Sequence, residues 1–201
     1  GVTLGPSTLV AQRLIFSPST QKLELEALKL AVSGKQGTNG FGASLEWPQL
    51  AVAGEQMKGS GFNGRFNLDG KTTLAGRFES GAPSGNFDAV RLPAFALKLD
   101  GSSGPRKIDG QLKSNLLLRP GRNAATMEKL ELRANITEPG LQPLVLTLGG
   151  NAGTDARGAQ WALQGALNNN KFDSTGSAAF SAAVPAVLAD VRLDLAPVVV
   201  S

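Results

Sequence analysis

Hydrophobic and polar residues alternate with a period of two along most of this chain. Residues 89–136 repeat the pattern three times: Phe95, Leu97 and Leu99; Ile108, Leu112, Leu116 and Leu118; Leu130, Leu132 and Ile136. A period of two puts these side chains on one face of an extended strand, whereas on a helix it would scatter them around the circumference. Glycine and proline at 101–105 and 120–123 separate the runs. The pattern predicts an antiparallel meander with one apolar face.

The same alternation predicts strands elsewhere. They are expected within residues 9–16, 22–32, 45–52, 62–68, 74–78, 87–99, 144–148, 161–167, 172–180 and 191–195, with a short helix at 182–189. Residues 34–42 are rich in glycine and predict a turn, and Asp69-Gly70 predicts a hairpin. Helix is the alternative for residues 22–32, because Glu, Lys, Ala and Leu are good helix formers.

Two irregularities interrupt the alternation. The phase slips at Leu28, which is what one extra residue in a strand produces, so we expect a β-bulge that bends the sheet. Pro48 interrupts a second run, and Pro93 stands 45 positions later among similar neighbours. This match indicates a repeated strand unit.

Composition agrees with a large β protein. The chain has 201 residues, 25 of them glycine, and only 5% aromatic residues, so the buried face must be mainly aliphatic. We expect a single domain, residues 1–201, that is all-β with few short helices. Two arrangements of its apolar face stay open: a β-sandwich, in which a second sheet covers it and which the residues alone favour, and a curved antiparallel sheet of many strands, folded over to form a groove.

Charge and residue types exclude several classes of site. The net charge is +4, but Lys and Arg occur singly among polar positions, so nucleic acid is not an expected partner. The chain has no Cys and no His, which excludes thiol nucleophiles, Ser-His relays and Cys/His zinc sites. No stretch reaches the roughly 20 apolar residues of a membrane span.

No motif assigns catalytic chemistry. Glu24 and Glu26 share one face of a predicted strand, but nothing apolar nearby would raise a carboxyl pKa. Gly59, Gly61 and Gly64 have dinucleotide-binding spacing, but a hairpin follows them instead of a helix. We therefore expect no catalytic residue, no cofactor and no metal site, and a protein that is not an enzyme.

Several segments resemble the AsmA family of Gram-negative envelope proteins. They are the leucine-rich run from Leu23 to Gly34, Leu45-Glu-Trp-Pro-Gln-Leu-Ala-Val, Ile108-Asp-Gly-Gln-Leu-Lys-Ser-Asn-Leu, Leu163-Gln-Gly-Ala-Leu, Phe172-Asp-Ser-Thr-Gly-Ser and Leu188-Ala-Asp-Val-Arg-Leu-Asp-Leu. The chain departs from the family at Asp194-Leu-Ala-Pro197, which has no Tyr, and the family's N-terminal membrane anchor is missing from this sequence.

The resemblance implies a periplasmic fragment of a protein tethered to the inner membrane. Its hydrophobic β-groove would hold or conduct acyl chains of phospholipid or lipopolysaccharide between the inner and outer membranes and support outer-membrane assembly, with outer-membrane assembly proteins as further partners. The expected groove-lining residues are Phe95, Leu97, Leu99, Leu112, Leu116, Leu118, Leu130, Leu132, Leu144, Leu146 and Leu148.

Two other functions compete with lipid transport. A β-sandwich adhesin or surface-binding module would have a sealed core and carry no lipid. A glycan-acting enzyme would need two carboxylates facing each other across a cleft.

Overall fold

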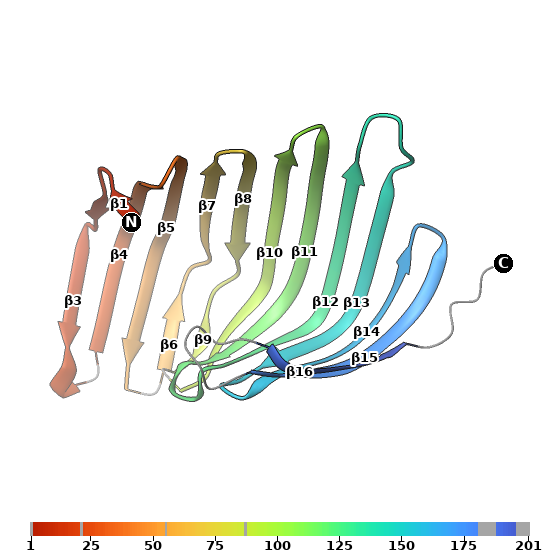
Figure 1. Ribbon diagram of the computed structural model, residues 1–201. Coiled ribbons are helices and arrows are strands. Elements are labelled where there is room, and N and C mark those ends of the chain that lie inside the picture. Colours follow the sequence, from red (N-terminus) through yellow and green to blue (C-terminus); the bar gives the residue numbers. More distant parts are fainter. Residues whose placement is uncertain (1, 21, 55, 87, 181–187, 196–201) are drawn as a thin grey trace.

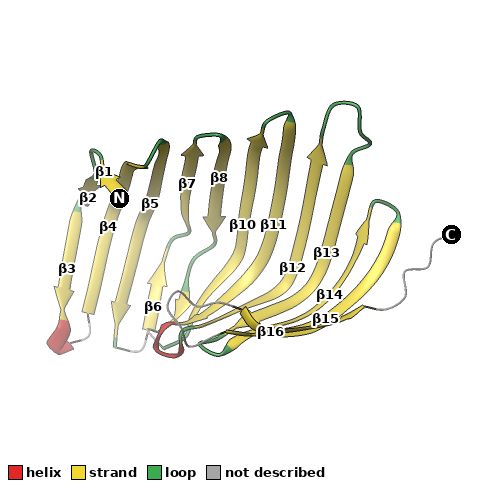
Figure 2. Ribbon diagram, viewed as in Figure 1, coloured by secondary structure: helices red, strands yellow, loops and turns green. Residues whose placement is uncertain are grey.

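The computed structural model describes residues 2–20, 22–54, 56–86, 88–180 and 188–195. Sixteen antiparallel strands form one sheet (Figure 1). The described helical elements are two single turns, η1 (Pro18–Thr20) and η2 (Pro120–Arg122) (Figure 2). The predicted all-β class with few short helices is confirmed. The alternative, a β-sandwich, is wrong for the described residues, because all their strands belong to one sheet.

The strands range in length from two to 15 residues. The first nine are β1 (Val2–Leu4), β2 (Thr8–Val10), β3 (Arg13–Ser17), β4 (Lys22–Gln36), β5 (Asn39–Ala53), β6 (Gln56–Gly59), β7 (Phe62–Asp69), β8 (Thr72–Ser80) and β9 (Ser84–Gly85). The other seven are β10 (Val90–Ser103), β11 (Arg106–Arg119), β12 (Ala124–Thr137), β13 (Leu144–Thr154), β14 (Gly158–Leu167), β15 (Asn170–Phe180) and β16 (Leu188–Leu195).

Consecutive hairpins build the sheet. At one end β1, β2 and β3 all pair with β4, which pairs with β5. Next, β6 and β7 pair with β5, and β8 and β9 pair with β10. From β10 onward each strand pairs with the next, as far as β16. The meander predicted for residues 89–136 is therefore the centre of the sheet.

Of three local predictions, one is confirmed, one is wrong and one falls mostly outside the described residues. The glycine-rich stretch 34–42 belongs mostly to β4 and β5, and residues 22–32 form a strand instead of the alternative helix. Most of the helix expected at 182–189 lies outside the described residues, and Leu188 and Ala189 begin β16. In residues 22–42 strand pairing prevails, because it satisfies backbone groups that a short isolated helix could not protect.

The sheet bends along a line where several strands contain a residue with positive φ. These residues are Ala27 in β4, Ala94 in β10 and Lys129 in β12, with φ of 51, 49 and 54°. The phase slip predicted at Leu28 falls at Ala27; the β4–β5 register stays regular because Pro48, opposite Ala27, interrupts β5 at the same level. The register of β10 shifts at Ala94, directly after Pro93.

Side chains of neighbouring strands hold two of these bulges. The backbone N–H of Ala94 donates to Asn115 Oδ1 (3.0 Å), and that of Lys129 donates to Asn151 Oδ1 (3.1 Å). The buried Ser114 hydroxyl donates to the carbonyl of Glu128, just before Lys129 (3.0 Å). In both bulges a backbone N–H group that has left the strand ladder thus keeps a hydrogen-bond acceptor. Because the same arrangement occurs in β10 and in β12, the strands bend at one level.

Below this bend line the lower parts of β10–β15 curl away from the plane of their upper parts, so the sheet forms a trough (Figure 1). Among the residues whose burial is described, few hydrophobic ones are buried: Leu25, Leu50, Val52, Met57, Leu92, Leu117, Leu130 and Ala178. A compact protein of 20.8 kDa exposes about 9,000 Å², whereas this chain exposes 13456 Å². The excess is what one uncovered layer of strands produces.

Candidate functional site

One face of the sheet carries a continuous apolar row at right angles to the strands. Residues paired across a ladder lie on the same face, so the register can be followed from β2 through β15. The row, here called the central row, comprises Leu9, Leu30, Leu45, Gly64, Phe78, Leu97, Leu112, Leu132, Leu148, Gly165 and Phe172. Eleven positions at strand spacings of about 4.8 Å give a length of about 48 Å. No charged or hydrogen-bonding side chain interrupts it.

The rows on both sides of the central row are also mainly apolar. Toward the upper strand ends lie Val32, Ala43, Phe66, Gly76, Leu99, Gly110, Ala134, Leu146 and Leu167. Beyond the bend line lie Leu92, Leu116, Met127, Ala152 and Trp161. We call this face the inner face and the opposite one the outer face.

All the residues expected to line a groove lie on the inner face. Leu97, Leu112, Leu132 and Leu148 stand in the central row itself. Leu99 and Leu146 lie one row above, and Phe95 and Leu130 lie at the bend line. Leu116 and Leu118 lie below it, and Leu144 lies near the upper strand end. Each bulge adds one residue to its strand at the bend. The extra residue shifts the alternation by one position, so the leucines above and below the bend lie on the same face.

The expected set was incomplete at both ends of the sheet. Leu30, Leu45 and Phe78 extend the central row toward β2, and Phe172 extends it into β15. The alternation in their own strands contained this signal. The alternation within a single strand does not show which residues it pairs with, so the sequence could not join those strands to the central ones.

Phenylalanine rings cover glycines on neighbouring strands. An added Cβ at Gly64 would lie 2.3 Å from the Phe78 ring, and one at Gly76 would lie 2.4 Å from the Phe66 ring. Phe41 covers Gly34 in the same way. Because each ring fills the space above a glycine, it packs flat against the sheet, and the inner face has little relief at these positions.

The two tryptophan N–H groups of the inner face already have partners. Trp47 Nε1 donates to the carbonyl of Ser60 (3.2 Å), and Trp161 Nε1 donates to Ser174 Oγ (3.1 Å). Among the described residues, the one buried side-chain polar atom without a partner is Asn135 Oδ1, on the outer face. The inner face therefore offers apolar contact without directed hydrogen bonds, which suits a flexible hydrocarbon better than a polar ligand.

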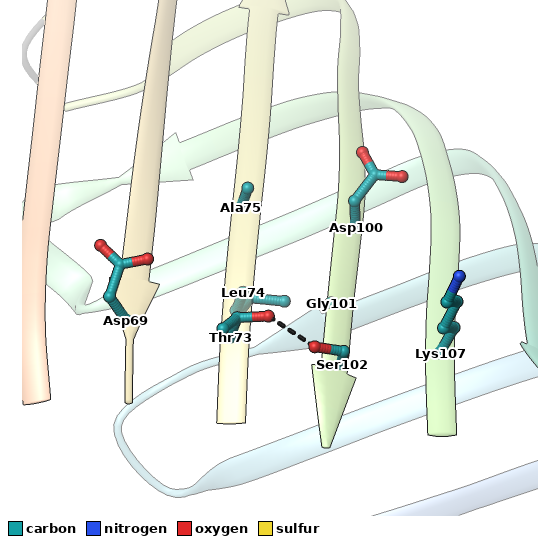
Figure 3. A pocket seen from close by; sticks show the side chains of 8 residues that line it. All are labelled: Asp69, Thr73, Leu74, Ala75, Asp100, Gly101, Ser102 and Lys107. Carbon is teal, nitrogen blue, oxygen red and sulfur yellow. Dashed lines mark hydrogen bonds between the residues drawn. The ribbon is translucent and has the colours of Figure 1, made fainter. Parts of the chain in front are cut away.

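The outer face is polar and carries shallow hollows. One, of about 320 Å³, lies among Asp69, Asp100 and Lys107, and a Thr73–Ser102 hydrogen bond of 2.8 Å crosses it (Figure 3). In this view Leu74 lies behind the strands, on the side to which the lower strand parts curl. The inner face is thus the concave face of the trough.

The Glu24 carboxylate in β4 lies between two cations. Glu24 accepts an ion-pair contact from Lys22 at 2.8 Å and another from Arg13 at 3.1 Å. The hydrogen bond from Lys22 and the charges of both cations hold the pKa of Glu24 below its usual value, the opposite of the raised pKa a general acid needs. The described residues contain no group of three or more acidic side chains able to hold a metal ion.

No protein-family model and no curated protein matches the chain, and no solved structure matches its fold. None of the helical segments among the described residues is long and apolar enough to cross a membrane.

Proposed function

We propose that this protein is a non-enzymatic carrier whose inner face holds the acyl chains of phospholipid or lipopolysaccharide. The observation that carries the proposal is the central row, which crosses eleven strands without a polar side chain and has no second layer over it in the described part of the chain. Water on so large an apolar surface is unfavourable by about 25 cal/mol per Å², and a lipid would displace it.

The dimensions suit hydrocarbon chains. The hydrocarbon core of a bilayer is about 30 Å thick, so one acyl chain spans about 15 Å. A central row of about 48 Å accommodates several chain lengths end to end. Because aliphatic side chains and flattened rings line it, a chain can move along it without breaking hydrogen bonds.

The likeness to AsmA proteins supports the same proposal. On this proposal the protein lies in the periplasm, tethered to the inner membrane, where it would carry lipid toward the outer membrane and support outer-membrane assembly. On this proposal any partner proteins belong to that assembly machinery.

The test is site-specific crosslinking. A photo-crosslinking amino acid replaces Leu97 or Leu132 on the inner face, or their neighbours Lys98 and Arg133 on the outer face as matched controls. After irradiation in a Gram-negative envelope, we expect lipid adducts by mass spectrometry at the inner positions only. Equal adducts on both faces, or none at Leu97 and Leu132, would overturn the proposal.

A further inference from the structure

Exposed apolar residues follow the upper edge of the trough. At the lower edge, Leu14 and Phe16 of the end strand β3 are also exposed, at 57 and 68%. Five turns form the upper edge, at 37–38, 70–71, 104–105, 138–143 and 168–169, and we call this edge the upper rim. Just inside it on the sheet stand Leu68, Ile108, Leu144 and Leu167, which are 45, 38, 40 and 39% exposed. The lower turns at 120–123 and 155–157 carry no large exposed hydrophobic residue.

One leucine on the upper rim projects from a rigid turn. The backbone N–H of Leu141 donates to the carbonyl of Glu138 (3.1 Å), and Gly140 has φ of 82°. With Pro139 before that glycine, the four residues have the features of a type II turn. Leu141, in the last position of the turn, is 65% exposed.

An ion pair fixes the base of this turn. Arg106, from the next turn along the rim, donates to Glu138 Oε2 through Nε (3.1 Å) and Nη2 (2.9 Å). Leu141 is therefore exposed on a segment held at both its backbone and its side-chain contacts. Leu141 thus adds a fixed, exposed apolar residue to the upper rim, which also carries Leu68, Ile108, Leu144 and Leu167.

Cations accompany these apolar residues. Within two positions of the five turns lie Lys35, Lys71, Arg106, Lys107 and Lys171, against the acidic Asp69 and Glu138. All five cations are exposed, and the four lysines make no ion pair with another described residue. By ladder register Lys35, Lys107 and Lys171 lie on the outer face, whereas the rim leucines lie on the inner face.

We propose that the upper rim docks on the surface of an anionic phospholipid bilayer. The lysines contact phosphate groups on the outer side of the rim, and Leu141 enters the interface. The apolar residues then form a continuous path from the bilayer over the rim to the central row. This inference rests on the proposed function, because it describes how lipid enters the trough along its side.

The test is flotation of the purified protein with vesicles of three parts phosphatidylglycerol to seven parts phosphatidylcholine. Neutralising two rim lysines (Lys71→Gln with Lys107→Gln) should weaken binding about 30-fold, since each basic residue near an anionic surface contributes about a fivefold factor. Leu141→Ser should weaken it about 10-fold. The matched control, Arg122→Gln with Arg157→Gln on the lower turns, should change it less than about threefold.

A second measurement separates this inference from the proposed function. Crosslinking of a soluble lysophospholipid at position 132 should persist in the lysine variant, because the trough is intact. If both double variants lose vesicle binding equally, or if the wild-type protein self-associates through the rim and ignores vesicles, the docking proposal fails while the trough proposal stands. Rim-dependent flotation without crosslinking at position 132 would support docking and overturn the trough.

Discussion

Leu132 offers the sharpest test of the inner face, because its side chain stands in the middle of the central row between Leu112 and Leu148. In Leu132→Gln the new side chain is similar in size to leucine but presents an amide to the acyl chain. An amide without a hydrogen-bonding partner costs about 1–3 kcal/mol in an apolar contact. At 1.4 kcal/mol per factor of ten, lipid affinity should fall about 5- to 140-fold.

The fold should tolerate this change. Leu132 is only partly buried in the lipid-free protein, so the amide can remain hydrated there. We expect a loss of less than about 1.5 kcal/mol in unfolding free energy, or about 3–6 °C in Tm. Arg133→Gln, one position away on the outer face, is the control. Titration with a fluorescent phospholipid measures the dissociation constants, and equal affinities for the two variants would refute a lipid-binding role for the inner face.

Three further changes test the structure of the sheet. Gly64→Ala should lower the unfolding free energy by about 1–3 kcal/mol in a urea titration, because its methyl group meets the Phe78 ring and, at 2.5 Å, the backbone carbonyl oxygen of Ser44. Asn115→Ala should cost about 1–2 kcal/mol in the same titration, since it removes the acceptor of the Ala94 N–H at the bend. The lowered pKa of Glu24 predicts that its ion pairs stabilise the fold above the ordinary pKa of 4.5 and that this stabilisation is lost as pH falls through the folded-state pKa. Glu24→Gln should therefore reduce the loss of stability between pH 6 and pH 3.

Controls separate these effects from general damage. Gly40→Ala places a methyl group 3.8 Å from its nearest neighbour and should change stability by less than about 1 kcal/mol. A Gly64→Ala protein as stable as Gly40→Ala would contradict the ring–glycine packing. If Asn115→Ala has the same unfolding free energy as the wild-type protein, water replaces the Asn115 side chain as acceptor for the Ala94 N–H. If Glu24→Gln and wild type lose stability equally with acid, the ion pairs with Lys22 and Arg13 contribute nothing measurable.

Much of the fold follows from local sequence. Alternation of leucine with polar residues determined that β10–β13 are strands, and it also determined which of their side chains share a face. Every expected lining residue lies on the inner face, because hairpin pairing joins like faces across a ladder. The phase slip before Leu28 likewise marked the bend at Ala27, since an extra residue leaves its trace in the spacing of apolar positions.

Other features depended on contacts between strands far apart in sequence. Pro48 and Pro93 were visible as interruptions, but only the assembled sheet shows both at the bend line, with Asn115 holding the second bulge. Leu117 shows the limit of the alternation. It is buried although its position in β11 puts it on the outer face.

By itself the sequence determined an apolar face and a polar face, because a side chain's face depends only on its position along the strand. What covers the apolar face was decided by tertiary structure alone. Strands covered by a second sheet and strands that line an open trough both alternate leucine with polar residues at a period of two. The pattern therefore cannot distinguish a sandwich from a trough. The described strands form one curved layer, and that arrangement leaves the central row accessible to a ligand.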